Sequence, residues 1–289
     1  MANDFADRDG WIWVDGDIVP WRDAKCHVLN HTMHYASGIF EGIRAYNGKS
    51  FKLDEHLVRL AESARLLGYA LPHSLEVLRA ATQTVLEANG LRDAYIRPFA
   101  WRGSEQMSVS APASRIHVAI AAWSMPAYFQ KDGAEAGVKL ALSSWQRQAP
   151  TMAPLQAKAA GLYMAGTLAK HAALDEGYDD ALMMDWQGNV AEATAANIFT
   201  MIDGTLVTPI ADAFLNGITR QTVIEIARSR GLTVSEERLP LEKLLTAQEI
   251  FVTGTAAEIV PVSRIGSMTF NLGPTTRDLL EAYQALVRA

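Results

Sequence analysis

The chain has 289 residues, 49% of them hydrophobic, and can bury roughly three quarters of the surface that its unfolded form exposes. This length suits one large domain or two modest ones. The net charge of −6 is spread along the chain without a cluster of basic and aromatic residues, which argues against a nucleic-acid ligand. The single cysteine, Cys26, excludes an internal disulfide and fits a reducing compartment.

The first ten residues are polar and acidic, unlike a signal peptide. No run of about 18 apolar residues occurs, so the sequence offers no membrane-spanning helix. We therefore expect a soluble, cytoplasmic protein that has no membrane partner and acts on small molecules.

Four tight-turn signals between β-rich runs predict antiparallel hairpins. They are Asp15-Gly16, Asn47-Gly48, Gln187-Gly188-Asn189 and Asp203-Gly204. Further along, apolar residues at helical spacing predict helices.

The first predicted helix follows Asp54, which we expect to be its N-cap. Its apolar stripe consists of Leu53, Leu57, Leu60, Ala64 and Leu67. Further helices are expected over about 75–89, 160–176, 218–230 and 275–288. Hairpins mixed with helices predict an α+β fold.

A polar stretch that contains glycine, residues 126–137, separates two β-rich halves. We predict a small N-terminal domain over 1–126 and an interdomain linker over 127–137. The larger C-terminal domain, β-rich with helices, is expected over 138–289.

Lys158 is the first candidate for chemistry. It lies among small and apolar residues in PLQAKAAGLY (154–163) and is the only charged side chain between Arg147 and Lys170. Apolar surroundings favour the neutral amine of a lysine, a nucleophile that forms Schiff bases. The alternative is a lysine whose stem covers apolar neighbours while its charge reaches the surface.

Glu192 is the second candidate, a carboxylate among apolar residues in GNVAEATAANIF, just past a predicted turn. An unpaired charge is costly to bury, so a cation should meet it. An arginine could be that cation, or Glu192 could lie exposed on an edge strand. Together with Lys158 it indicates pyridoxal phosphate, whose aldehyde binds a lysine and whose ring nitrogen a carboxylate keeps protonated.

The phosphate of this cofactor would be held by backbone amides where helices begin. One candidate segment is Gly217-Ile218-Thr219, at the start of a predicted helix, and the other is 254–257, after a β-like run. Gly-Thr pairs are also common turn residues, so either segment could be an ordinary turn.

Three histidines offer a competing metal site. His27, His31 and His34, beside Cys26, would lie near one face of a helix. The only carboxylate in CHVLNHTMHYASGIFEG is Glu41, well past the last histidine. We expect no metal here.

Seven blocks, in order along nearly the whole chain, resemble the branched-chain aminotransferases, which are fold type IV pyridoxal-phosphate enzymes. They are FEGIRAY (40–46), HLVRL (56–60), YIRP (95–98), AKAAGLY (157–163), AEATAANIF (191–199), NGITRQTV (216–223) and VTGTAAEIVPV (252–262). The resemblance implies the two-domain fold of the D-amino acid aminotransferase type, with a small N-terminal α/β domain. It also implies transamination of leucine, isoleucine and valine with 2-oxoglutarate.

The resemblance gives roles to individual residues. Lys158 would hold the cofactor aldehyde and, once released by substrate, carry a proton between the substrate α-carbon and C4′ of the cofactor. Glu192 would face the pyridine nitrogen, and Tyr163 would hydrogen-bond the ring hydroxyl. The remaining cofactor-binding residues, chiefly at the phosphate, would be Arg59, Gly217, Ile218, Thr219, Gly254 and Thr255.

A substrate pocket is implied as well. Alternation along AYIRPF predicts that Tyr95 and Arg97 face the same side of a strand. Arg97 would pair with the side-chain carboxylate of glutamate, and Tyr95 would bind the α-carboxylate together with the amides of Thr255 and Ala256. The other members would be Tyr35, Tyr128 and Phe40, the last as part of an apolar wall or as an ordinary core aromatic.

The resemblance further implies a homodimer or a higher homo-oligomer, in which a loop of the partner's small domain closes the site. Residues 106–109 are our candidate for that loop. The chain departs from the family pattern at EATAAN, at KAAGLY and at Met125, where a glycine-rich block, KAGGNY and tryptophan are expected. Met125 would give a softer apolar wall.

Three other activities share this fold, namely those of a D-amino acid aminotransferase, an (R)-amine transaminase and an aminodeoxychorismate lyase. YIRP followed by AWRG favours the branched-chain enzyme. A non-catalytic binding protein is the remaining alternative, and the presence of Lys158, Glu192 and Tyr163 together argues against it.

Overall fold

The structure is a computed structural model that describes residues 4–125 and 137–289. The chain forms two compact units. Unit 1 is Met1–Met125 with Ala157–Gly161, and unit 2 is the rest of the chain.

The linker expected over 127–137 lies almost wholly outside the described residues and stays a prediction. Ala157–Gly161, expected in the C-terminal domain, belongs to unit 1 instead. The reason is main-chain pairing, since Ile39 forms a β-bridge with Ala159 and Ala160 donates to the carbonyl of Gly38. Lys158 is therefore part of unit 1.

Unit 1 is built on a seven-stranded sheet in the order β2-β1-β7-β6-β4-β5, with β3 paired to β6. All of these pairs are antiparallel. The strands are β1 (Trp11–Val14), β2 (Asp17–Pro20), β3 (Ile39–Phe40), β4 (Ile43–Tyr46), β5 (Lys49–Ser50), β6 (Ala94–Arg102) and β7 (Ile116–Trp123).

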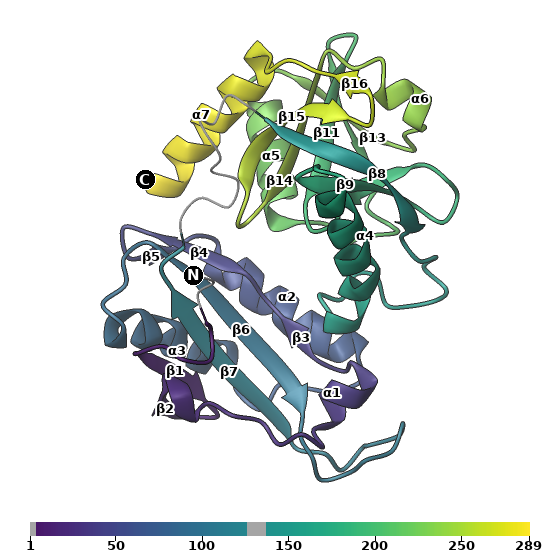
Figure 1. Cartoon of the computed structure of the whole chain (residues 1–289). Helices are drawn as coiled ribbons and strands as arrows, with labels where there is room; N and C mark the ends of the chain where they lie inside the picture. The colour runs from purple at the N-terminus through teal and green to yellow at the C-terminus, as the bar shows by residue number, and fades with distance from the viewer. Residues whose placement is uncertain (1–3, 126–136) are drawn as a thin grey trace. The chain divides into compact units, whose positions relative to one another are not determined.

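Helices α2 (Leu53–Leu66) and α3 (Leu75–Ala88) pack against each other, and α3 contacts β1 and β7 (Figure 1). The predicted stripe of α2 is confirmed, because Leu57, Leu60 and Ala64 are fully buried. The expected N-cap was wrong. Asp54 lies inside the first turn, where a negative charge complements the helix dipole. Unit 1 also contains the short helices η1 (Trp21–Asp23) and α1 (His31–Tyr35).

Unit 2 contains a nine-stranded sheet in the order β10-β9-β8-β15-β14-β11-β12-β13. Strand β10 also pairs with β11, which closes six of the strands into a ring. The strands are β8 (Val138–Gln146), β9 (Asp180–Met184), β10 (Val190–Ala193), β11 (Asn197–Ile202), β12 (Thr205–Pro209), β13 (Thr233–Glu237), β14 (Glu249–Gly254), β15 (Glu258–Ile265) and β16 (Met268–Thr269), the last paired with β15.

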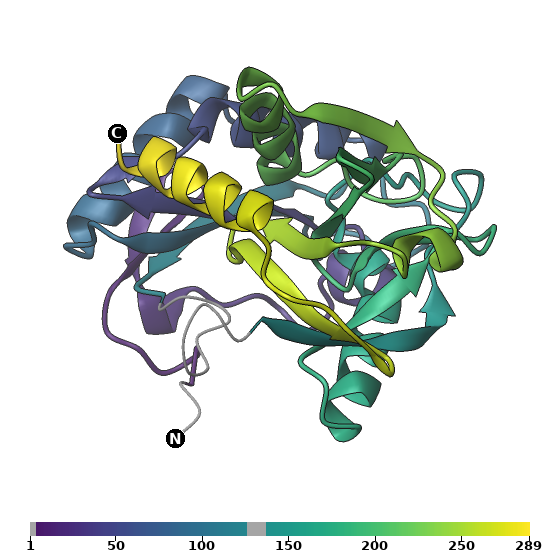
Figure 2. The ribbon, with the colours of Figure 1, turned by 90° about the horizontal axis from the view of Figure 1, so that it is seen from above.

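The helices of unit 2 are η2 (Ala160–Tyr163, which begins in unit 1), α4 (Met164–Asp175), α5 (Ile218–Ser229), α6 (Leu241–Leu244) and α7 (Pro274–Arg288). The helices expected over about 160–176, 218–230 and 275–288 are confirmed to within a few residues, and the short helix α6 was not predicted. Helix α4 packs on β8 and β9. Helix α7, yellow in Figure 2, packs against β14, β15 and α5.

All four predicted hairpins are confirmed. Asp15, Asn47 and Asp203 have φ values of 51°, 52° and 47°, and the glycine after each also has positive φ, as two-residue hairpin turns require. The third signal, Gln187–Asn189, joins β9 to β10. The parallel pairs β8–β9, β8–β15 and β12–β13 were not predicted.

Within the described residues, no helix combines the length and the apolar character needed to cross a bilayer. The expected cytoplasmic location stays a prediction.

Helix α7 begins on a buried carboxylate. Glu249, only 6% exposed, accepts hydrogen bonds from the main-chain N–H of Thr275 and from the N–H and hydroxyl of Thr276, at 3.2, 2.7 and 2.7 Å. Glu249→Gln should lower the free energy of unfolding by about 1–3 kcal/mol, because the amide accepts these bonds more weakly and buries an extra N–H group.

Urea denaturation measures this change, with the exposed Glu242→Gln as control. Equal stability of the two variants would show that Glu249 does not hold α7.

Candidate functional site

The main chain around Lys158 is held at two points besides the β-bridge of its neighbour. The N–H of Phe40 donates to the carbonyl of Lys158 at 3.0 Å, and the N–H of Lys158 donates to the hydroxyl of Ser63 at 2.9 Å. Ser63 is fully buried on α2. The base of the lysine side chain is thereby fixed to a strand end and to a helix.

Four predicted site residues meet in unit 1. The Nζ of Lys158 lies 4.9 Å from the ring centre of Phe40, and Cζ of Arg97 lies 4.8 Å from the same centre. Arg97 donates to the hydroxyl of Tyr95 at 3.2 Å, which confirms that both residues face one side of β6. Lys158 and Arg97 therefore both lie against the ring of Phe40.

The position of the Tyr95 ring requires a glycine at residue 42. A Cβ atom at Gly42 would lie 2.0 Å from the Tyr95 hydroxyl oxygen, so no larger residue fits there without moving the ring. The Nε of Arg97 is buried and has no hydrogen-bond partner among the described residues. Such a donor suits an anionic ligand.

Arg59, expected at a phosphate, is tied to a carboxylate. Its Nε and one terminal nitrogen donate to Glu41 at 2.7 and 2.8 Å. Glu41 is fully buried between β3 and β4, and Nδ1 of His56 lies 2.7 Å from it. This buried triad was not predicted.

The triad keeps Glu41 ionised. Burial acts to raise the pKa of Glu41, but the charge and hydrogen bonds of Arg59, followed by the hydrogen bond from His56, bring this pKa down to about 2. Burial lowers the pKa of His56 against the opposing effect of Glu41. The imidazole is therefore neutral near pH 7, and its Nδ1–H donates to Glu41, since a carboxylate can only accept.

Tyr35 closes α1 and is 42% exposed, with its ring 4.8 Å from that of His31. His31 contacts the hydroxyl of Ser37 and the carbonyl of Ser108, both at 3.0 Å. This residue, part of the competing histidine cluster, therefore joins α1 to the loop that contains residues 106–109. Across the described parts of the chain, no three His, Cys, Asp or Glu side chains are grouped to hold a metal.

In unit 2, Glu192 lies on β10 and is 8% exposed. Asn197 donates its amide to one carboxylate oxygen at 3.0 Å, and Arg147 forms an ion pair with the other at 3.1 Å. The alternative of an exposed edge strand is thus wrong, because β10 pairs on both sides. The alternative of an arginine partner is confirmed.

Asn197 also reaches the segment before α5. Its amide donates to the carbonyl of Leu215 at 3.1 Å, and its Oδ1 lies 2.2 Å from where a Cβ of Gly217 would stand. Only glycine fits at that position. One buried side chain thus positions both Glu192 and the start of α5.

Gly217 is the N-cap of α5, and no side chain caps this helix. Ile218 and Thr219 are buried in its first turn. Arg220, 1% exposed, donates to Asn216 at 2.9 Å and to Glu236 at 2.7 Å. The amides at this helix start are rigidly held, which suits an anion.

The other predicted members of the site lie at element ends. Gly254, Thr255 and Ala256 form the end of β14 and the turn to β15. Tyr163 is the N-cap of α4. Tyr128 lies outside the described residues.

Five residues that were not predicted hold the predicted ones in place. They are Glu41, His56, Ser63, Arg147 and Asn197. Glu41 carried the clearest signal, a lone carboxylate in the apolar run SGIFEGI.

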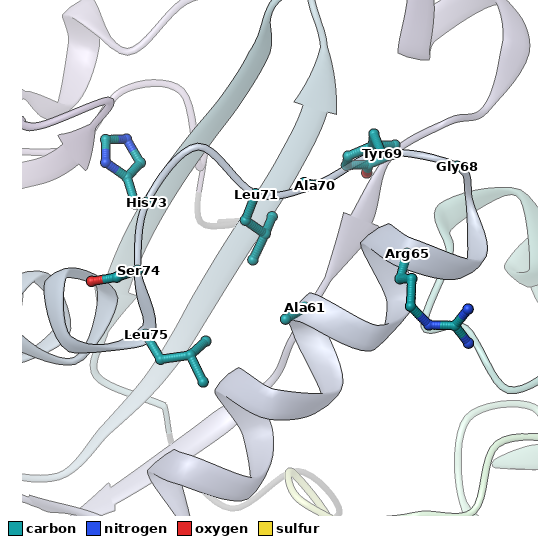
Figure 3. A pocket seen from close by; sticks show the side chains of 9 residues that line it. All are labelled: Ala61, Arg65, Gly68, Tyr69, Ala70, Leu71, His73, Ser74 and Leu75. Atoms are coloured by element: carbon teal, nitrogen blue, oxygen red, sulfur yellow. The ribbon is translucent and has the colours of Figure 1, made fainter.

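A hollow of about 510 Å³ in unit 1 is lined by the end of α2, the start of α3 and the connection between them (Figure 3). Arg65, Tyr69 and His73 are among its lining residues. It contains none of the predicted site residues, so it is not the candidate site.

Comparison with known proteins identifies the family. Residues 38–265 match the amino-transferase class IV family. The branched-chain-amino-acid aminotransferase of Pseudomonas aeruginosa is 41% identical over 289 residues, which cover 98% of this chain and 94% of the relative. The chain belongs to the class IV aminotransferases.

Solved structures are similar to this aminotransferase along its length. The branched-chain amino acid aminotransferase of Escherichia coli has a TM-score of 0.94 and 36% identity, covering 97% of this chain and 95% of that one. A branched-chain amino acid aminotransferase from T.th., complexed with N-(5'-phosphopyridoxyl)-L-glutamate, has a TM-score of 0.92 and 38% identity, with coverages of 97% and 95%. The fold class predicted from the sequence is confirmed.

The buried triad makes the aminotransferase sensitive to acid. The pKa of Glu41, about 2 in the folded state, lies below its ordinary 4.5, so its charge stabilises the fold above pH 4.5 and this stabilisation is lost as the pH falls through about 2. Between pH 5 and 3 the loss amounts to about 2 kcal/mol. Glu41→Gln should be less stable than the wild type at pH 5. Its free energy of unfolding should then fall by about 2 kcal/mol less than that of the wild type between pH 5 and 3.

Urea denaturation at a series of pH values gives both curves, and the exposed Glu55→Gln serves as control. An unchanged acid dependence in Glu41→Gln would contradict the ionised triad.

Proposed function

We propose that this aminotransferase transfers the amino group of branched-chain L-amino acids to 2-oxoglutarate, with pyridoxal 5'-phosphate as cofactor (EC 2.6.1.42). The observation that carries the proposal is that Nζ of Lys158 and Cζ of Arg97 lie 4.9 and 4.8 Å from the Phe40 ring centre, in a chain that matches branched-chain aminotransferases over nearly its full length. A lysine amine and a cation for a second carboxylate are the two groups that this reaction requires.

The residues fit the cofactor. Lys158 supplies the amine for the aldehyde. Its main chain is fixed by hydrogen bonds with Phe40 and Ser63. The uncapped start of α5, with Gly217, Ile218 and Thr219, offers amides to a phosphate.

When bound, the cofactor supplies an aldehyde that condenses with amines and a ring that withdraws electrons from the substrate α-carbon. Lys158 would anchor it through its amine and would then be the base that carries a proton at the substrate α-carbon. Glu192, held by Arg147 and Asn197, accepts a hydrogen bond from the ring nitrogen, and Tyr163 binds the ring hydroxyl. Arg59, Gly254 and Thr255 complete the binding of the phosphate.

Substrate recognition has an apolar and a charged part. Phe40 gives leucine, isoleucine or valine an apolar surface, while Arg97, with its buried Nε, meets the second carboxylate of glutamate. The T.th. enzyme in complex with a phosphopyridoxyl derivative of L-glutamate supports the binding of glutamate, the amino acid formed from 2-oxoglutarate. We assign the α-carboxylate to Tyr95, Thr255 and Ala256, and the rest of the pocket to Tyr35 and Tyr128.

The proposal includes a homodimer. Met107 and Val109, in the candidate loop 106–109, are 43% and 82% exposed, which suits a segment that a second copy covers. A dimer stays a prediction, as does the role of the loop.

The function is tested by adding L-leucine to purified enzyme. The visible absorbance of the bound cofactor should bleach with L-leucine and recover with 2-oxoglutarate, and D-leucine should have no effect. Lys158→Ala should fold normally, lack transamination and lose the absorbance of the lysine-bound cofactor, because the amine is both anchor and proton carrier. Wild-type turnover in Lys158→Ala, or bleaching by D-leucine alone, would refute the proposal.

Recognition of two kinds of substrate is tested at Arg97. Arg97→Leu should slow the half-reaction with glutamate about ten- to a hundredfold, since a charge-assisted hydrogen bond contributes roughly 1.5–3 kcal/mol. The half-reaction with leucine should remain nearly intact. Single-turnover absorbance measurements with each amino acid separate the two.

Equal losses with both amino acids would assign Arg97 to the α-carboxylate or to the fold. No loss with either would mean that glutamate's second carboxylate is bound elsewhere.

A further inference from the structure

We propose that Glu41 is a positioning residue that orients Arg59 and thereby makes the enzyme prefer a phosphorylated cofactor. The inference rests on the proposed function, in which Arg59 binds the phosphate. Glu41 itself touches neither cofactor nor substrate in this account and acts only through Arg59.

The geometry of the pair supports orientation rather than simple charge balance. Two nitrogens of Arg59 donate to the two different oxygens of Glu41, at 2.7 and 2.8 Å. A guanidinium bound through two parallel hydrogen bonds has its plane fixed, and its remaining N–H groups point in set directions. The side chain of Arg59 is only 14% exposed, so packing restricts it further.

Glu41 is itself fixed from two sides. Its main-chain N–H donates to the carbonyl of Pro98 at 2.9 Å, which ties it to β6. His56, one turn before Arg59 on α2, contacts the same carboxylate at 2.7 Å. Arg59 is thus held by the carboxylate of a residue that is itself bonded to β6 and to His56 of α2.

The same face of α2 carries Arg59 and, one turn later, Ser63, whose hydroxyl accepts from the N–H of Lys158. One helix therefore sets the position of the lysine main chain and, with Glu41, the direction of the arginine. A phosphate meets a guanidinium whose orientation is already set. In a variant without the Glu41 carboxylate, the phosphate would have to order Arg59 on binding, and affinity would fall.

The experiment compares two ligands for the apoenzyme, pyridoxal 5'-phosphate and pyridoxal, which share the ring and aldehyde and differ in the phosphate. Glu41→Gln should raise the dissociation constant for pyridoxal 5'-phosphate about three- to tenfold, the range expected when one long side chain must be ordered on binding. Its dissociation constant for pyridoxal should stay within about twofold of wild type. Absorbance titration measures both.

Two further variants guard against a folding defect. Glu41→Asp keeps the buried charge but shortens the side chain by one methylene, so it should fold and still lose several-fold of the preference for the phosphorylated ligand. Glu249→Gln is the matched control, a buried carboxylate in unit 2 whose replacement should lower stability without changing the preference.

Arg59→Gln separates the inference from the function on which it rests. If Arg59→Gln loses the preference and both Glu41 variants keep it, Glu41 does not position Arg59 and the inference is overturned. If Arg59→Gln keeps the preference, the assignment of Arg59 to the phosphate fails, and the inference fails with it. Equal weakening of both ligands in the Glu41 variants would show that Glu41 supports only the fold.

Discussion

A carboxylate is buried in this protein where hydrogen-bond donors replace the water that it loses, and much of the site depends on two such groups. Glu41 in unit 1 is fully buried against Arg59 and His56, and Glu192 in unit 2 is 8% exposed against Arg147 and Asn197. The desolvation of a carboxylate costs several kcal/mol unless it is paired in this way. Each charge therefore fixes the side chains around it.

The partners of these carboxylates are also the links to the rest of each unit. Helix α2 contributes Arg59 and His56 to Glu41 and Ser63 to the main chain of Lys158. Asn197 bonds Glu192 and the carbonyl of Leu215, two residues before the N-cap of α5. The proposed cofactor-binding residues and the residues that hold them in place thus belong to the same hydrogen-bonded networks. A substitution at a positioning residue should therefore change the activity.

Local patterns predicted much of this fold, because a hairpin turn or the apolar face of a helix is determined by residues that are close together in the sequence. The four turns and the buried face of α2 are examples, and the alternation of β6 correctly put Tyr95 and Arg97 on one side. Contacts between segments that are distant in the sequence produce no local pattern. The bond from Phe40 to Lys158, which brings the lysine into unit 1, and the pair of Glu41 with Arg59, 18 residues apart, emerge only in three dimensions.

Glu192 accepts a hydrogen bond from Asn197 and pairs with Arg147, and we propose that it keeps the cofactor ring nitrogen protonated. The most direct measurement is the nitrogen-15 chemical shift of pyridoxal 5'-phosphate labelled at the ring nitrogen and bound to the enzyme at neutral pH. We expect the shift of a protonated ring nitrogen in the wild type and of an unprotonated one in Glu192→Gln. An unprotonated ring nitrogen in the wild type would contradict the claim.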